Sequence, residues 1–297
     1  MARYAFRILN VFAPSTFEGN PLCVFEDARG LDQPTMLMLT RQFNLSETAF
    51  VFPPSPEQRD AGVTACVRVF TPGHEMAFAG HPALGCAHAV RATYQAGDRL
   101  TLRFKAGDVP VSVADAAAAD TWMLAPPLAR APTRRAPALA SSEVADMLGL
   151  TSDDLAHDPV WMDTGNDHLL VPVRDRGALA RATFDPVRTR HWPVSSLGRK
   201  TAYLFCVNAD DGRHLDVSAR YFFIRDGASV EDPGTGSACA NLGAWLALVQ
   251  GRFDVTVQVT QGQEMNRLCR LMLAVNGQGG IQVGGQVIEV GCGQVDI

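Results

Sequence analysis

The sequence predicts an α+β protein in which two buried helices are each wrapped by their own, mostly antiparallel sheet. Short runs rich in β-branched and aromatic residues recur along the chain between Gly, Pro and Asp turns. This spacing is typical of antiparallel sheets and not of alternating strands and helices. Two segments, 82–93 and 237–249, are apolar on most faces of a helix, which indicates helices enclosed by other elements.

Further helices are expected over 33–43, which is amphipathic, and over 142–148, where a pair of serines offers an N-cap. Strands are predicted wherever a β-rich run is bounded by turn residues. These runs cover residues 4–12, 22–25, 47–52, 63–70, 100–104, 160–162, 169–173, 202–207, 218–224, 255–260, 271–275, 281–283 and 287–290.

The chain length predicts two lobes. Its 297 residues suit two domains of about 150 residues each, with a core large enough to need no disulfide or structural metal. The Pro-, Ala- and Arg-rich stretch 126–140 is interpreted as a linker. We therefore expect an N-terminal lobe over 1–125 and a C-terminal lobe over 141–297, with the C-terminal strand returning to the N-terminal lobe.

The two halves resemble each other loosely. Arg68-Val69-Phe70 precedes Gly80 by twelve positions, and Arg220-Tyr221-Phe222 precedes Asp232 by twelve. In both cases a β-rich run leads through a loop and a Gly-containing turn into an apolar helix. Spacing alone leaves a duplication and a coincidence equally open.

Charge and composition exclude several classes of protein. The 26 basic and 31 acidic residues give a net charge of -5, and the short basic stretch 133–135 is expected to be a solvated loop, so a nucleic-acid partner is not expected. The seven cysteines are scattered along the chain and show no CxxC. We expect them to be reduced thiols in a cytoplasmic protein. No run approaches the roughly 18 apolar residues of a membrane-spanning helix, and the N-terminus lacks a signal-peptide pattern.

Glu47 is the first candidate for chemistry. It follows the predicted helix 33–43 and opens an apolar strand in the segment Asn44-Leu45-Ser46-Glu47-Thr48-Ala49-Phe50. A carboxylate in this position is either a surface strand end or a partly desolvated acid or base. Burial disfavours the charged form of a carboxylate, which makes it a useful proton carrier near neutral pH.

Two Gly-containing turns precede the apolar helices. In the first, Gly80 and Pro82 flank His81, and in the second, 232–237 offers a carboxylate, hydroxyls and backbone N–H groups. The start of a helix binds anions through its N–H groups and its partial positive charge. The alternatives are a histidine hydrogen-bonded at a helix start and an ordinary capped helix. The second turn matches neither a P-loop nor the G-x-S-x-G elbow.

Metal and cofactor signals are weak. The histidines form no HExxH pair, and His74, His81 and His88 lie on both sides of a turn. No G-x-G-x-x-G follows a strand, which argues against a nicotinamide or flavin site. We expect neither a metal nor a cofactor.

Together, in this order, the motifs resemble the PhzF-like family of phenazine biosynthesis proteins. The matching segments are 17–21 (FEGNP), 44–50 (NLSETAF), 68–72 (RVFTP), 78–82 (FAGHP) and 231–238 (EDPGTGSA), with a weaker match at 165–169 (GNDHL).

The resemblance implies a diaminopimelate-epimerase-like fold of two similar lobes, each a curved sheet around a central helix, with the site between them. It also implies a homodimer without a cofactor, whose partner is a small anionic substrate. The implied reaction is an isomerisation in which Glu47 moves a proton, similar to that of trans-2,3-dihydro-3-hydroxyanthranilate isomerase. The implied catalytic residues are Glu47, His81, Asp232 and Ser237, and the implied substrate-binding residues are Gly80, Gly236, Thr235 and Asn20.

One departure from related folds narrows the chemistry. Racemases and epimerases of this fold use a cysteine from each lobe, whereas the turns 79–81 and 232–234 contain none. Cys86 and Cys239 fall within the predicted helices. An isomerisation by one carboxylate is therefore favoured over inversion by two thiols. An epimerase of another amino or hydroxy acid and a non-catalytic binding protein stay as alternatives.

Overall fold

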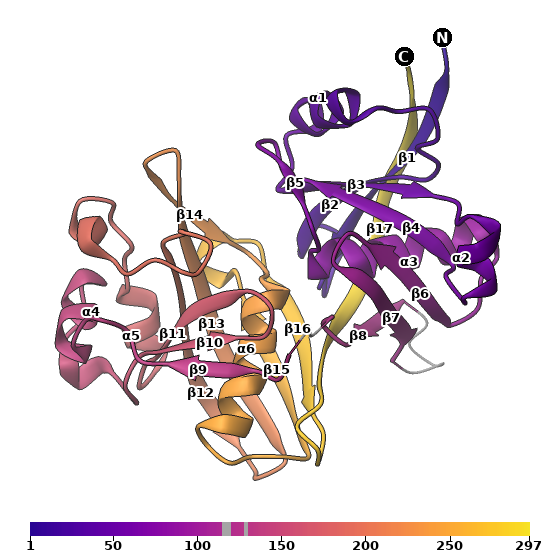
Figure 1. Cartoon of the computed structure of the whole chain (residues 1–297). Helices are drawn as coiled ribbons and strands as arrows, with labels where there is room; N and C mark the ends of the chain where they lie inside the picture. The colour runs from indigo at the N-terminus through magenta and orange to yellow at the C-terminus, as the bar shows by residue number, and fades with distance from the viewer. Residues whose placement is uncertain (115–119, 128–129) are drawn as a thin grey trace. The chain divides into compact units, whose positions relative to one another are not determined.

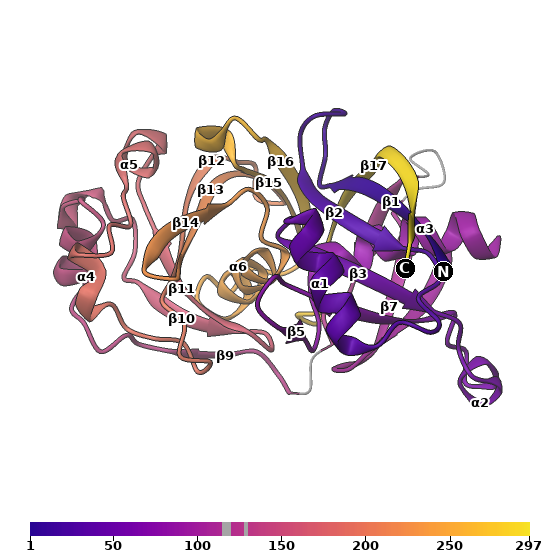
Figure 2. The same ribbon diagram turned by 90° about the horizontal axis from the view of Figure 1, so that it is seen from above.

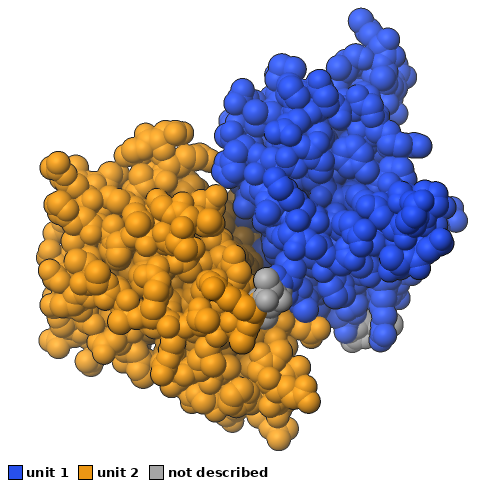
Figure 3. All heavy atoms as spheres, in the orientation of Figure 1, with its two compact units in different colours: residues 1–127, 284–297 blue, residues 128–283 orange. Residues whose placement is uncertain are grey.

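The computed structural model describes residues 1–114, 120–127 and 130–297. These residues form an α+β protein, which confirms the predicted fold class. They divide into two compact units (Figure 3): unit 1 comprises Met1–Pro127 and Gly284–Ile297, and unit 2 comprises Leu128–Val283. Residues 128–129 of the expected linker lie outside the described residues. Within the described residues, every helix is too short or too polar to span a membrane.

The strands of unit 1 form a ring around helix α3 (Gly80–Tyr94), as Figures 1 and 2 show. Most neighbours are antiparallel, but β2–β3 and β4–β6 are parallel. Helix α1 (Gln33–Phe43) packs against β3 and β4, and α2 is the short segment Pro56–Asp60. In order of pairing, the ring contains β17 (Ile281–Asp296), β1 (Arg3–Val11), β2 (Asn20–Phe25), β3 (Glu47–Phe52), β4 (Ala65–Phe70), β6 (Arg99–Phe104), β7 (Gly107–Val113) and β8 (Thr121–Leu124), which returns to β17; β5 (Glu75–Met76) is a hairpin partner of β4.

Unit 2 wraps its strands around helix α6 (Gly236–Leu248) in the same manner. Its parallel pairs are β11–β12 and β13–β15. The paired strands are, in order, β9 (Thr133–Arg135), β10 (Val160–Asp163), β11 (Asp167–Pro172), β12 (Thr201–Asp210), β13 (His214–Arg225), β15 (Val255–Gln261) and β16 (Cys269–Val275), with β14 (Ala228–Asp232) as the hairpin partner of β13. The remaining helical segments are α4 (Ser141–Met147), α5 (Arg176–Arg181) and the 3-10 turns Ser152–Asp154, Arg188–His191 and Gln263–Met265.

The two units share one arrangement of strand, hairpin, turn and helix. In unit 1, Arg68 on β4 binds Glu75 on β5 through two contacts of 2.7 Å, and its guanidinium lies 5.2 Å from the ring of the phenylalanine two residues further on. In unit 2, Arg220 on β13 binds Glu231 on β14 at 2.9 and 2.8 Å, and the corresponding distance to the phenylalanine ring is 4.6 Å. The chain therefore contains a structural duplication.

The duplication differs in one detail from the spacing match. Residues 71–74 connect the paired phenylalanine and glutamate of unit 1, whereas 223–230 connect those of unit 2 because the hairpin is longer. Helix α3 begins at Gly80 and α6 at Gly236, in each case after the hairpin. Gly80 therefore corresponds to Gly236, and the match of Gly80 with Asp232 is wrong.

Two further predictions are wrong. The strands expected over 281–283 and 287–290 form one continuous strand, β17. Gly284 makes no turn there; a β-carbon at this position would overlap the Trp122 carbonyl oxygen, so the glycine permits a close approach of β8. The basic stretch 133–135, expected as a loop, is strand β9 because it pairs with β10.

Candidate functional site

Glu47 and His81 form the first group of candidate residues, in unit 1. Helix α1 ends at Phe43, its C-cap Asn44 turns the chain with a left-handed backbone (φ 52°), and Glu47 then begins β3. His81 lies in the first turn of α3. Its Nε2 is 3.5 Å from Oε2 of Glu47, and the side chains of Glu47 and His81 are 17% and 7% exposed. The structure thus brings a carboxylate and an imidazole together in a mostly buried setting.

Asn20 lies at the same end of the sheet as Glu47, because β2 runs parallel to β3. Its side chain is buried, and the Ser46 hydroxyl donates a hydrogen bond of 3.3 Å to Asn20 Oδ1. Gly19, just before it, has φ 88°, and a β-carbon there would approach the Val11 carbonyl oxygen to 2.8 Å. Only glycine fits this turn, so the turn fixes where Asn20 is presented.

The first turn of α3 attracts negative charge. Gly80, His81 and Pro82 occupy it, and the N-cap residue Ala79 offers no side-chain acceptor. The first N–H groups of a helix have no partner within the helix, and the aligned peptide dipoles add roughly half a positive charge. Pro82 lacks an N–H and suits this position. The Glu47–His81 pair therefore stands at a helix end suited to an anion.

Asp232, Thr235 and Gly236 belong to the second group, at the start of α6 in unit 2. The Thr235 hydroxyl donates a short hydrogen bond to Asp232 Oδ2. Gln261, at the end of β15, is fully buried and donates to the Asp232 carbonyl oxygen at 2.8 Å and to Thr235 Oγ1 at 3.1 Å. The turn before α6 is therefore anchored on its sheet, and Thr235 holds the Asp232 carboxylate.

Ser237 is joined to the interior of unit 2 through His168. The serine Oγ lies 2.9 Å from His168 Nε2, and the other ring nitrogen, Nδ1, lies 3.1 Å from the Tyr221 hydroxyl. Ser237 is half-buried, whereas His168 and Tyr221 are 2% and 7% exposed. Burial lowers the pKa of His168 to about 4, so its imidazole is neutral near pH 7.

A second buried residue, Asn241, fixes the loop before His168. It lies within α6 and is fully buried. Its amide donates to the carbonyl oxygens of Met162 and Asn166 at 2.8 and 2.9 Å, and its Oδ1 accepts a 2.6 Å hydrogen bond from Thr164. These bonds tie the loop 163–166 to the central helix, which positions the strand that carries His168.

The structure therefore gathers the predicted residues into two groups. Asn20, Glu47, Gly80 and His81 lie together in unit 1, and Asp232, Thr235, Gly236 and Ser237 lie together in unit 2. Sequence reasoning missed the supporting roles of His168, Asn241 and Gln261. For His168 a signal was present in the weak match at 165–169, whereas Asn241 and Gln261 carry no local signal.

The cysteines are mostly buried. Cys86 lies in α3 and Cys239 in α6, and burial raises the pKa of both thiols. A thiol held in its neutral form is a poor base and a poor nucleophile. Among the described residues, no group of three His, Cys, Asp or Glu side chains is arranged to hold a metal ion.

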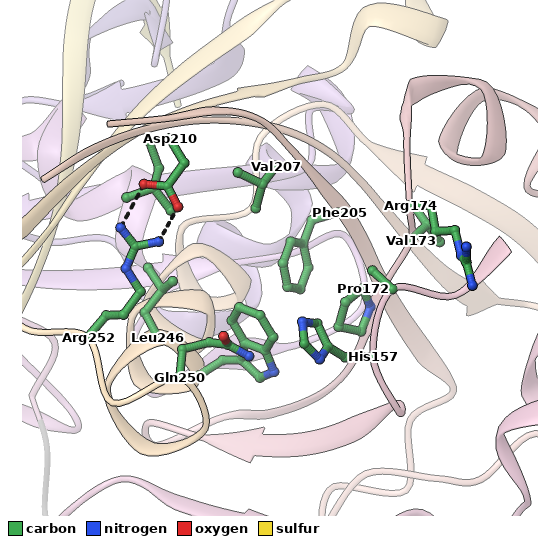
Figure 4. Close-up of a pocket in the computed structure, with 13 residues that line it drawn as sticks. His157, Pro172, Val173, Arg174, Phe205, Val207, Asp210, Leu246, Gln250 and Arg252 are labelled. Carbon is green, nitrogen blue, oxygen red and sulfur yellow. Dashed lines mark hydrogen bonds and ion pairs between the residues drawn. The ribbon is translucent and has the colours of Figure 1, made fainter. Parts of the chain in front are cut away.

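A separate cavity of about 240 Å³ lies in unit 2 near the C-terminal end of α6, and Figure 4 shows it. His157, Phe205 and Trp245 line it, and the ion pair between Asp210 and Arg252 lies at one side. Helix α6 has 13 residues and is therefore roughly 20 Å long. The cavity and the Ser237 group lie at different ends of this helix, and none of the predicted site residues lines the cavity.

The fold and the two helix-start groups define a class of α+β proteins with duplicated, sheet-wrapped helices. The model of the family described as "Phenazine biosynthesis-like protein" matches residues 9–291, and the chain belongs to this family.

Named relatives and a solved structure agree with this assignment. An "uncharacterized isomerase" of Pasteurella multocida is 34% identical over 98% of this chain and 94% of the relative. The trans-2,3-dihydro-3-hydroxyanthranilate isomerase of Pseudomonas aeruginosa is 32% identical over 94% of this chain and 92% of the relative. The crystal structure of a PhzF-family phenazine biosynthesis protein from Bacillus anthracis has a TM-score of 0.82 at 25% identity and is covered over 100% of both chains.

Proposed function

We propose that this chain is an isomerase that transfers a proton within a small carboxylate-bearing substrate, with Glu47 as the general acid and base and without a cofactor. The names of its relatives support the class of reaction. The observation that carries the role of Glu47 is its mostly buried carboxylate, 3.5 Å from His81 at the start of a helix. The substrate is similar to trans-2,3-dihydro-3-hydroxyanthranilate, the compound for which one relative is named.

In the proposed reaction the Glu47 carboxylate removes a proton from a substrate carbon. The electron pair of the broken C–H bond forms a new double bond to the neighbouring carbon. The electron pair of the original double bond moves onto a second carbon. The protonated Glu47 then returns the proton to that second carbon, so the reaction is balanced and involves no oxidation. His81 and the N–H groups at the start of α3 stabilise the negative charge that develops between the two steps.

The second group, at the start of α6, is proposed to bind the carboxylate of a substrate. Ser237 and Gly236 bind an oxygen of its carboxylate at the start of α6. Asp232, held by Thr235, orients the substrate or assists the proton transfer. The preferred ligand therefore has a carboxylate at one end and an uncharged ring or chain at the other.

Two alternatives receive less support. A two-thiol epimerase would need reactive cysteines, but burial raises the pKa of both Cys86 and Cys239. A protein that only binds its ligand would not require a carboxylate beside an imidazole at a helix start. Both alternatives predict distinct outcomes in the experiment below.

The test is proton exchange in deuterated water with trans-2,3-dihydro-3-hydroxyanthranilate and related unsaturated amino and hydroxy acids. Between the two steps the protonated Glu47 exchanges its proton with the solvent, so we expect deuterium at the newly protonated carbon of the isomerised product. We expect Glu47→Gln to slow turnover at least about 100-fold with unchanged folding. Glu57→Gln, on the exposed helix α2, is the matched control and should behave as the wild-type protein does. Near-native turnover by Glu47→Gln would refute the assignment. Exchange at a stereocentre without isomerisation would indicate an epimerase, and binding without exchange would indicate a non-catalytic protein.

The resemblance also leads us to propose a cytoplasmic homodimer. Sedimentation at several protein concentrations tests the dimer: a single species with twice the mass of one 32.0 kDa chain is expected. Fractionation of the producing cells tests the location, and recovery in the membrane or external fraction would contradict it.

A further inference from the structure

Tyr221, His168 and Ser237 form a continuous row of hydrogen-bonding side chains. The distances are 3.1 Å from the Tyr221 hydroxyl to His168 Nδ1 and 2.9 Å from His168 Nε2 to Ser237 Oγ. Each member comes from a different element: Tyr221 from β13, His168 from β11 and Ser237 from α6. The row runs from the buried interior of unit 2 to the half-buried helix start.

The charge state of each member limits the directions of these bonds. The buried His168 is neutral near pH 7, so one ring nitrogen donates and the other accepts. Burial, reinforced by the nearby Asp232 carboxylate, raises the pKa of Tyr221, so its hydroxyl keeps its hydrogen. Two arrangements remain, with the His168 hydrogen on either Nδ1 or Nε2.

The relative strengths of donors and acceptors decide between the two arrangements. A phenol is a stronger acid, and hence a better hydrogen-bond donor, than the alcohol of a serine. An imidazole nitrogen is a better acceptor than a phenol oxygen. The favoured row therefore runs from Tyr221 O–H to Nδ1 and from Nε2–H to Ser237 Oγ. In the opposite row the Ser237 hydroxyl would donate to Nε2 and Nδ1–H would donate to the Tyr221 oxygen, so the row would use the weakest donor and the weakest acceptor.

We propose that Tyr221 and His168 are positioning residues that hold Ser237 as a hydrogen-bond donor toward the substrate. Because Ser237 Oγ accepts from His168, its own hydrogen is directed away from the ring and is available to an oxygen atom of a ligand. The group recognised by this hydrogen is therefore a carboxylate or carbonyl oxygen. This inference deepens the proposed function and rests on it for the presence of a substrate at the start of α6.

The surroundings hold the row in place. The Asp167 carboxylate, next to His168, accepts hydrogen bonds from the Ser196 backbone N–H and hydroxyl and lies 2.8 Å from Arg135 Nη2. Although burial opposes ionisation, these bonds hold the pKa of Asp167 below its usual value, so the charge that attracts Arg135 is retained. Arg135 also lies 4.4 Å from the centroid of the Trp161 ring on the neighbouring strand.

Comparison of the duplicated units indicates that the row is a special feature of unit 2. Gly19 and Gly165 both have left-handed backbones, with φ of 88° and 100°, and each begins a Gly-Asn turn before a strand. Three residues after these glycines stand Leu22 in unit 1 and His168 in unit 2. Leu22 is fully buried and apolar, so packing at this position does not require a histidine. The histidine is explained by its bonds to Ser237 and Tyr221.

Nitrogen NMR of histidine-labelled, substrate-free protein tests the direction of the row. We expect His168 to carry its hydrogen on Nε2 and to stay neutral between about pH 5 and pH 8. Tyr221→Phe should change the Nδ1 resonance through loss of its donor. Tyr203→Phe removes another buried phenol, whose ring centroid is 6.5 Å from that of Tyr221, and should leave Nδ1 unchanged. A hydrogen on Nδ1 in the wild-type protein, or an Nδ1 resonance indifferent to Tyr221→Phe, would overturn the proposal.

A binding cycle with benzoate tests the consequence for Ser237. Tyr221→Phe should weaken benzoate binding by about 5- to 10-fold, the value of one hydrogen bond, when Ser237 is present. In the Ser237→Ala background the same change should have no effect, because the row no longer reaches the ligand. Equal losses in both backgrounds would show that Tyr221 acts on the fold alone and would overturn the proposal. If the wild-type protein does not bind benzoate, the ligand class of the proposed function fails, and the NMR result decides the inference by itself.

Discussion

At the scale of single residues, the duplicated fold carries different chemistry in its two copies. The pairing of β3 with β4 and of β12 with β13 makes Thr201 the counterpart of Glu47. Likewise, His81 corresponds to Ser237, since each is the second residue of a central helix. Unit 1 thus presents a carboxylate and an imidazole, and unit 2 presents a hydroxyl supported from within. The two copies of the duplicated fold therefore carry different side chains at matching positions.

The buried His168 should make the stability of the fold depend on pH. Its pKa is about 4 in the folded protein and near 6.5 when exposed, so the unfolded chain binds the proton first as the pH falls. The contribution of the neutral His168 to the free energy of unfolding is fully present above about pH 6.5 and is lost as the pH falls toward 4. Between pH 7.5 and pH 5 we expect a loss of about 2 kcal/mol from this residue. Urea unfolding at both pH values measures it.

The matched variants for this measurement are His168→Gln and His214→Gln. His168→Gln should reduce the difference in unfolding free energy between the two pH values, because the titrating group is absent. His214 is exposed, and its replacement is the comparison for the loss of a histidine at the surface. A pH dependence that is the same in all three proteins would show that His168 does not titrate as described.

At the scale of elements, glycines set the distance between the central helices and their sheets. A β-carbon on Gly85 of α3 would overlap Leu22 of β2. A β-carbon on Gly243 of α6 would lie 2.9 Å from Leu273 Cδ1 and 3.1 Å from Ile281 Cγ2. The helices therefore sit as close to their sheets as the backbone allows. The helix starts, and with them the functional groups, are held at a fixed depth.

This packing reverses the usual effect of a substitution. Gly to Ala within a helix ordinarily stabilises by about 1 kcal/mol. Gly243→Ala should instead destabilise by about 1–3 kcal/mol, because the added methyl group cannot fit against Leu273 without displacement. Gly97→Ala, outside the helices, controls for the added methyl group alone, since nothing lies within 4 Å of its β-carbon position. Thermal unfolding compares the two, and a stabilised Gly243→Ala protein would contradict the close packing.

The same elements show what the sequence could predict. Both central helices were predicted to within two residues, from the apolar runs 82–93 and 237–249. A helix that is buried on all faces needs apolar residues throughout, so its sequence alone reveals it. Glu47 was correctly expected at the start of a strand. Pairings between distant segments left no such local signal: β9 pairs with β10, and His168 meets a serine 69 positions away. Gly284 was misread because a glycine that admits a neighbouring strand resembles one that makes a turn.

At the scale of the whole molecule, the accessibility of the seven cysteines predicts how the protein responds to thiol reagents. Cys292 is exposed and Cys66 is partly exposed, whereas the other five are buried. Iodoacetamide should label Cys292 first and leave deuterium exchange into substrate unchanged. Mass spectrometry of the native protein checks the labelled positions, with Cys292→Ser as the control. Labelling of Cys86 or Cys239 in the native protein, together with loss of exchange, would instead indicate thiol chemistry.

The path of β17 also determines the order in which the two units can fold. Unit 2 is one continuous stretch, Leu128–Val283, but the ring of unit 1 needs β17 between β1 and β8. The ribosome makes this strand after all the other strands of the ring. The earlier strands of unit 1 therefore keep open sheet edges while unit 2, which is made after them, can already fold. We expect a released chain truncated after residue 283 to hold unit 2 protected from protease and unit 1 still susceptible. Strand β17 thus completes a sheet whose other strands were made much earlier.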